Sequence, residues 1–135
     1  MPGIRSLDDR GFIQAFQVID RVIQNNQPLF VLVWAGSVLA LIAAAVLGLW
    51  TLSGPDRALM IAAALLYLAG VQLPTIAINI PLNNRIQQQN VGAMTETMQK
   101  RARDDFEPRW NRWNAIRTGC ASLSSILLLL LLTRV

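Results

Sequence analysis

Three long runs without a charged residue dominate the pattern of apolar and polar positions along this chain. They lie within residues 28–53, 58–80 and 118–133. A helix needs about 20 apolar residues to cross the hydrocarbon core of a bilayer, which the first two runs provide. The third run is shorter, but the arginines that flank it can extend to the two interfaces. The pattern predicts membrane-spanning helices over residues 28–53, 58–80 and 114–134.

The segment before the first span, residues 1–27, has the pattern of an amphipathic helix. The apolar residues that share one face at helical spacing are Phe12, Phe16, Ile19 and Ile23. Such a helix can lie in the membrane interface or pack on a partner, and we expect the interfacial position.

The second span ends in the stretch "INIPLNNRI" of residues 78–86, where amides follow directly on hydrocarbon. We expect Pro74 to kink this span and Pro81 to end it, because proline lacks a backbone N–H and clashes with the preceding turn. Asn79 and Asn83 then have freed carbonyls close by. Their amides either cap the helix end or line a pocket.

A connection, residues 81–113, leads to the third span, whose helix we expect to begin near Asp104 with Pro108 in its first turn. One face of its start has the spacing i, i+3, i+4, i+7 and carries Trp110, Trp113, Asn114 and Arg117. A charged side chain at the edge of the hydrocarbon is costly unless it finds water or partners. We therefore expect Arg117 to point into the bundle and meet Asn79 and Asn83.

These six residues form the candidate binding site: Asn79, Asn83, Trp110, Trp113, Asn114 and Arg117. One interpretation is a pocket walled by two indoles. The other is helix-capping amides beside an ordinary interfacial belt of tryptophans. The pattern identifies no catalytic residue.

Composition supports one all-α integral membrane helical bundle, because the 135 residues are 53% apolar and only 15% charged. With a single cysteine, Cys120, and no histidine, the chain cannot form an internal disulfide, a thiolate cluster or a histidine-based metal site or triad. We expect no metal and no cofactor.

Ten of the twelve Lys and Arg residues lie in residues 1–27 and 81–117. The positive-inside rule places residues 81–117 in the cytoplasm and the C-terminus outside, in a multi-pass protein of the inner (plasma) membrane. The net charge of +4 favours anionic lipid over nucleic acid, since no basic run with interleaved stacking residues occurs. Besides the bilayer, we expect partner membrane helices or subunits on a small-residue stripe, which allows close helix approach. The stripe consists of Gly36, Ala40, Ala44 and Gly48.

The stretch "INIPLNNRI" resembles the N-x-P-x-N signature of the anthrone oxygenase-like integral membrane proteins, a largely uncharacterised family. The segment "RWNRWNAIRT" resembles that family's later W-x-x-[WH]-x-x-R segment. The resemblance implies a four-helix membrane bundle. It also implies an activity, because characterised fungal members oxidise anthrones to anthraquinones with molecular oxygen and without metal or flavin.

Two features depart from the family pattern. The histidine often found in the tryptophan segment is replaced at the candidate position by Asn114, so no general base is evident. The chain also begins where the family's first span would have ended, so we expect an apolar stretch upstream or a partner helix beside residues 36–48.

Two functions therefore remain open. In the first, the protein is a cofactor-independent oxygenase, or a binder of a flat aromatic or quinone-like molecule. The indoles would stack on this molecule, the amides would hydrogen-bond its oxygens, and Arg117 would stabilise an enolate or peroxide charge. In the second, the protein is a non-catalytic accessory subunit of a larger membrane complex. The missing histidine and span favour the second function, whereas the resemblance favours the first.

Overall fold

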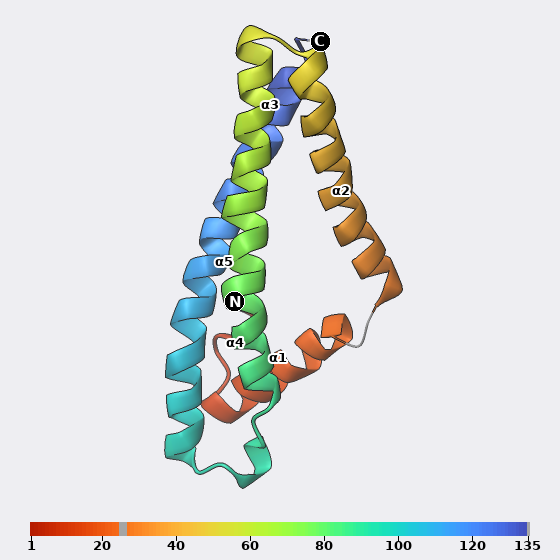
Figure 1. Ribbon diagram of the computed structural model, residues 1–135. Helices are drawn as coiled ribbons and strands as arrows, with labels where there is room; N and C mark the ends of the chain where they lie inside the picture. The colour runs from red at the N-terminus through yellow and green to blue at the C-terminus, as the bar shows by residue number, and fades with distance from the viewer. Residues whose placement is uncertain (25–26, 135) are drawn as a thin grey trace.

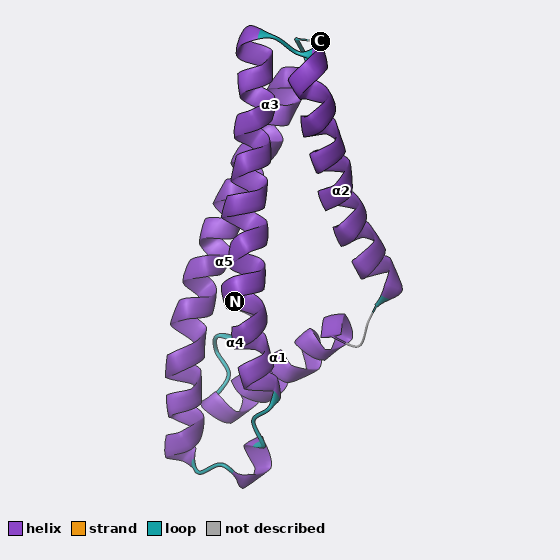
Figure 2. Cartoon of the chain, in the orientation of Figure 1, coloured by secondary structure: helices purple, strands orange, loops and turns teal. Residues whose placement is uncertain are grey.

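The computed structural model describes residues 1–24 and 27–134, and within these ranges every regular element is helical (Figures 1 and 2). The main elements are α1 (Asp9–Gln24), α2 (Pro28–Thr51), α3 (Gly54–Tyr67), α4 (Ile80–Gln87) and α5 (Glu96–Leu132), with 3₁₀ turns η1 (Pro2–Ile4) and η4 (Val91–Ala93). Three continuous helices are long and apolar enough to cross a membrane: Pro28–Thr51, Gly54–Gln87 and Glu96–Leu132. The predicted all-α membrane fold is confirmed.

The second long helix runs through both of its inner prolines. Two π-helical turns, η2 (Leu68–Gln72) and η3 (Thr75–Asn79), lie on either side of Pro74 and join α3 to α4. The Thr75 hydroxyl donates to the Val71 carbonyl at 2.6 Å. This bond supplies an additional donor next to Pro74, which has no backbone N–H. Pro81 lies in the first turn of α4 and the helix continues to Gln87, so the expected stop at Pro81 is wrong.

The third long helix begins earlier than expected. Its N-cap is Thr95, whose hydroxyl accepts from the Met98 N–H at 3.3 Å, and Pro108 lies in its interior. The expected start near Asp104 is therefore wrong. Ion pairs between side chains four residues apart stabilise the turns on the N-terminal side of the proline. They join Lys100 to Asp104 and Arg103 to Glu107, each at 2.8 Å.

The second and third long helices pack antiparallel along their length (Figure 1). Gly70 makes this close approach possible, because a Cβ at that position would lie 2.6 Å from the Cys120 Sγ and 2.8 Å from its Cβ. Farther along, the Ser124 hydroxyl donates to the Ala63 carbonyl at 2.9 Å.

Helix α2 contacts α3 at the end of the molecule that carries the α2–α3 connection and the C-terminus (Figure 1). Gly48 is buried, and its α-carbon faces Met60. Nearer the other end, the Trp34 indole donates to the Gln72 amide oxygen at 3.0 Å. Gly36 faces open space. Gly48 of the small-residue stripe thus packs against α3 of the same chain. Packing of Gly36 on a partner stays a prediction.

Helix α1 packs across α4 and α5 at the opposite end (Figure 1). Phe12 and Phe16 are buried there, whereas Ile19 and Ile23 are 56% and 45% exposed. The expected apolar face is thus divided between the protein core and the surface. The buried cluster comprises Phe12, Ile13, Phe16, Leu82, Ile86, Val91 and Phe106.

Candidate functional site

A chain of side-chain hydrogen bonds joins the three helices at this end. The Trp110 indole of α5 donates to the Asn83 amide oxygen of α4 at 2.9 Å. The Asn83 amide nitrogen in turn donates to the Asp20 carboxylate of α1 at 2.8 Å. Two of the six expected site residues, Asn83 and Trp110, are therefore in direct contact.

Asp20 is the central acceptor of this network and is only 5% exposed. Its second carboxylate oxygen accepts from the Gln87 amide at 3.0 Å. Gln87 also donates to the Gln17 carbonyl at 2.9 Å, and the Gln17 amide donates to the Ile86 carbonyl at 2.8 Å. Amides of α1 and α4 thus surround a buried carboxylate with complementary partners.

Asp20, Gln17 and Gln87 were not predicted from the sequence to belong to the site. The missed signal was the spacing of Phe12, Phe16 and Asp20, which recur every four residues and so share one face of α1. The two phenylalanines on that face predict that it is buried, and Asp20 would be buried with them.

An aromatic cluster lies beside the network. The ring centroids of Phe16 and Phe106 are 4.6 Å apart and those of Phe16 and Trp110 6.0 Å apart, both in edge-to-face arrangements. The Phe106 and Trp110 centroids are 6.4 Å apart. The hydrogen bond to Asn83 and these ring contacts together fix the Trp110 indole.

Asn79 lies one helical turn before Asn83 and is only 3% exposed. Neither its amide nitrogen nor its amide oxygen has a hydrogen-bond partner among the described residues. Leaving a buried polar group unpaired costs on the order of 1–3 kcal/mol. Asn79 precedes α4 without forming a side-chain cap, so the capping interpretation fails at this residue.

Arg117 is partly buried, and its Nε likewise has no hydrogen-bond partner within the described ranges. The expected hydrogen bond between Arg117 and Asn79 is therefore not formed. Asn83 is already engaged by Trp110 and Asp20.

The antiparallel register limits where Asn79 can face α5. The contacts Asn83–Trp110 and Gly70–Cys120 lie on either side of it along the helix pair. The stretch of α5 opposite Asn79 therefore falls between residues 110 and 120, where the remaining expected residues lie. Trp113 and Asn114 are half-buried in this stretch.

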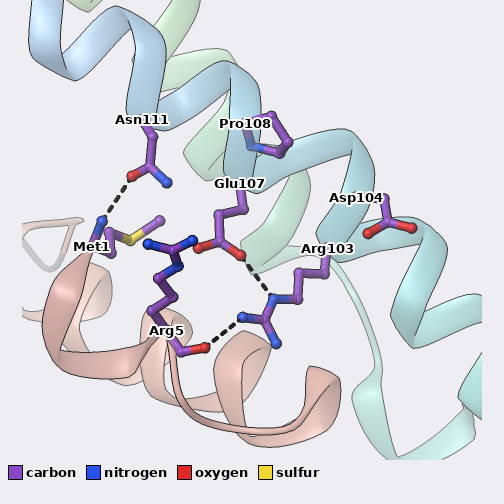
Figure 3. Close-up of a pocket in the computed structure, with 7 residues that line it drawn as sticks. All are labelled: Met1, Arg5, Arg103, Asp104, Glu107, Pro108 and Asn111. Carbon is purple, nitrogen blue, oxygen red and sulfur yellow. Dashed lines mark hydrogen bonds and ion pairs between the residues drawn. The ribbon is translucent and has the colours of Figure 1, made fainter.

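The surface also has two hollows that are lined by none of the six expected residues. One, of about 540 Å³, separates the N-terminal segment from α5 (Figure 3). There Arg103 donates to Glu107 at 2.8 Å and to the Arg5 carbonyl at 2.9 Å, so it fastens the two segments together. The other, of about 480 Å³, lies between α4 and α5 beside Phe106. In the part of the chain that the structure describes, no group of three or more Cys, Asp or Glu residues could hold a metal ion.

Sequence comparison identifies the family. The family model described as anthrone oxygenase matches residues 18–127, which is more than half of the chain. The chain belongs to the anthrone oxygenase family. The matched range contains Asp20 and all six expected site residues, and the predicted membership of this family is confirmed. No curated protein and no solved structure matches the chain.

Proposed function

We propose that this member of the anthrone oxygenase family binds a flat, oxygen-bearing aromatic molecule of the anthrone or quinone class between α4 and α5, and oxidises it with molecular oxygen without a bound cofactor. The observation that carries the proposal is the Asn79 amide. It is 3% exposed, and both its donor and its acceptor are without partners among the residues described.

An aromatic ketone or phenol matches the hydrogen-bonding capacity of this amide. A ketone oxygen accepts from the amide nitrogen, and a phenolic hydroxyl donates to the amide oxygen. Binding would thus recover the desolvation cost that Asn79 bears in the unliganded protein. Nearby Asn83 already bonds Trp110 and Asp20, so Asn79 is the amide that discriminates between ligands.

The aromatic and charged neighbours suit the same ligand. Trp110 is fixed by Asn83, and Trp113 lies on the next turn of α5. Indole rings stack on or pack edge-to-face against flat ring systems. The partly buried Arg117 guanidinium provides donors at the same level, where a ligand oxygen that gains negative charge would be stabilised.

The reaction consumes one anthrone and one O₂ and yields one anthraquinone and one water. Removal of a proton from the methylene carbon leaves an electron pair delocalised onto the ketone oxygen, and donors such as Asn79 and Arg117 would stabilise that enolate. The enolate carbon then bonds to oxygen to form a hydroperoxide. Cleavage of the O–O bond and loss of the second methylene hydrogen release water and form the new carbonyl.

Oxygen consumption in lipid nanodiscs tests the proposal. Purified protein and anthrone should consume O₂ and form anthraquinone, detected by its absorbance, faster than empty nanodiscs, which give the rate of autoxidation. Arg117→Met should lower the rate more than Arg109→Met, which changes an exposed arginine of the same helix. A wild-type rate equal to that of empty nanodiscs would contradict the proposal.

One observation favours a second function, that of a non-catalytic accessory subunit. In α2, every residue of which is described, Gly48 is the single buried residue and Gly36 faces open space. A partner helix packed on α2 would bury this surface. A photocrosslinker at position 36 should then capture one defined membrane protein in stoichiometric yield, whereas one at the exposed Leu130 of α5 should not.

A further inference from the structure

Asp20 supplies a carboxylate, a group that is absent from the two family-like motifs of this chain. Proton removal from an anthrone needs a base, and the chain has no histidine. The structure places a carboxylate, 5% exposed, in the same network as Asn83 and Trp110.

We propose that Asp20 is the general base that takes the methylene proton of the bound aromatic ketone, an inference that rests on the proposed function. Two helical relationships place it beside the ligand position. Asn83, which donates to Asp20 at 2.8 Å, lies one turn from Asn79 on the same helix. Phe16, which meets Trp110 edge-to-face, lies one turn before Asp20 on α1. The carboxylate thus lies between the helix that carries Asn79 and Asn83 and the aromatic cluster of Phe16, Phe106 and Trp110.

The proton transfer is balanced within the proposed reaction. The carboxylate forms an O–H bond as the methylene C–H bond breaks, and the C–H electron pair moves into the ring system and onto the ketone oxygen. O₂, the co-substrate, then oxidises this enolate by forming the C–O bond. Asp20 returns its proton to the hydroperoxide oxygen that leaves as water.

Asn83 and Gln87 act as positioning residues for this base. Each donates an amide N–H to a different carboxylate oxygen, at 2.8 and 3.0 Å. A carboxylate has about four lone-pair sites, and these two bonds, one to each oxygen, orient the group. These two donors are neutral amides, so they hold the carboxylate in place without themselves adding a positive charge beside it.

The alternative is a purely structural role, in which the hydrogen bonds of Asp20 hold α1 against α4. The test must distinguish this role from general base catalysis. We propose an anaerobic assay with anthrone deuterated at its methylene carbon, in which loss of deuterium to solvent reports proton removal without oxidation. Asp9→Asn is the matched control, because Asp9 is an acid of the same helix that pairs with Arg103 away from the cluster.

General base catalysis contributes about 10²–10⁴-fold. Asp20→Asn should therefore lower the exchange rate at saturating anthrone at least about 100-fold, with the Kd for anthrone unchanged, whereas Asp9→Asn should leave the rate unchanged. An unchanged exchange rate in Asp20→Asn that still binds anthrone would overturn the role of Asp20 and leave the proposed function intact. Absence of anthrone binding to the wild type would overturn both.

The wild-type pH profile decides the question if Asp20→Asn does not fold. With a protein group as the base, the exchange rate is independent of hydroxide concentration over part of the pH range. A rate that keeps rising in proportion to hydroxide concentration would mean that solvent removes the proton, and would overturn the proposal.

Discussion

The indole N–H of Trp110 donates to the amide oxygen of Asn83 at 2.9 Å. This bond joins the two sequence motifs that resemble those of the family, one on α4 and one on α5. The same Asn83 side chain donates to Asp20, so the two motifs and α1 form one polar network.

Loss of the indole donor should destabilise this network. Trp110→Phe keeps an aromatic ring but leaves the Asn83 oxygen without its donor, which costs on the order of 1–3 kcal/mol. Trp50→Phe is the control, because Trp50 is 76% exposed and should change stability by no more than about 0.5 kcal/mol. Thermal unfolding in detergent measures both variants, and equal stabilities would contradict the network.

Arg103 should be the residue that holds the N-terminal segment on α5. It donates to the Leu7 carbonyl at 2.8 Å and to Asp9 at 3.1 Å, and its guanidinium lies 4.4 Å from the Phe12 ring centroid. Arg103→Lys removes the planar fork of donors that this arrangement requires. Hydrogen exchange of residues 1–24 should become faster in Arg103→Lys and stay unchanged in the control Arg101→Lys, which alters an exposed side chain. Equal exchange in both would show that another contact holds the segment.

Gly70 should tolerate no side chain. A Cβ there would lie 2.8 Å from the Cys120 Cβ, an atom fixed to its backbone, so the two helices would have to separate. Gly70→Ala should therefore cost on the order of 1–3 kcal/mol. Gly119→Ala, where a Cβ meets nothing within 4 Å, should be neutral, and Cys120→Gly should restore stability to Gly70→Ala. Failure of that rescue in thermal unfolding would show that the contact is not the cause.

The charge asymmetry predicts the orientation in the membrane. Cysteines placed singly at positions 88 and 100 in a Cys120→Ala background should resist an impermeant thiol reagent in intact cells and react after permeabilisation. A cysteine at the exposed Ser53, in the α2–α3 connection, should react in intact cells. Labelling at positions 88 and 100 without labelling at 53 would reverse the orientation.

The membrane-spanning helices could be predicted from the sequence because charge-free apolar runs of bilayer length are typical of transmembrane helices. The effect of the prolines on the helices could not be predicted in the same way. Pro81 lies in a turn that tolerates it, and π-helical turns flank Pro74. Pro74, Pro81 and Pro108 are all interior to long helices, because neighbouring turns and packing against other helices compensate for the missing donors.

For the site, the sequence predicted only which residues of a single helix share a face. Helical spacing grouped Asn79 with Asn83, and Trp110 with Arg117. It could not show which pairs meet across helices, and the structure pairs Asn83 with Trp110 and Asp20 rather than with Arg117. Those pairings depend on the tertiary register of α1, α4 and α5, which helical spacing does not specify.

The central claim of the proposed function is that the buried Asn79 amide hydrogen-bonds the ligand. Thermal unfolding of Asn79→Leu in nanodiscs tests this claim. Leucine has nearly the same shape and removes the unpaired polar atoms, so the unliganded variant should be more stable than wild type by on the order of 1–3 kcal/mol. Anthraquinone should raise the unfolding midpoint of wild type and of the exposed control Asn90→Leu, but not that of Asn79→Leu. An Asn79→Leu variant that is less stable than wild type and is still stabilised by anthraquinone would contradict this role of Asn79.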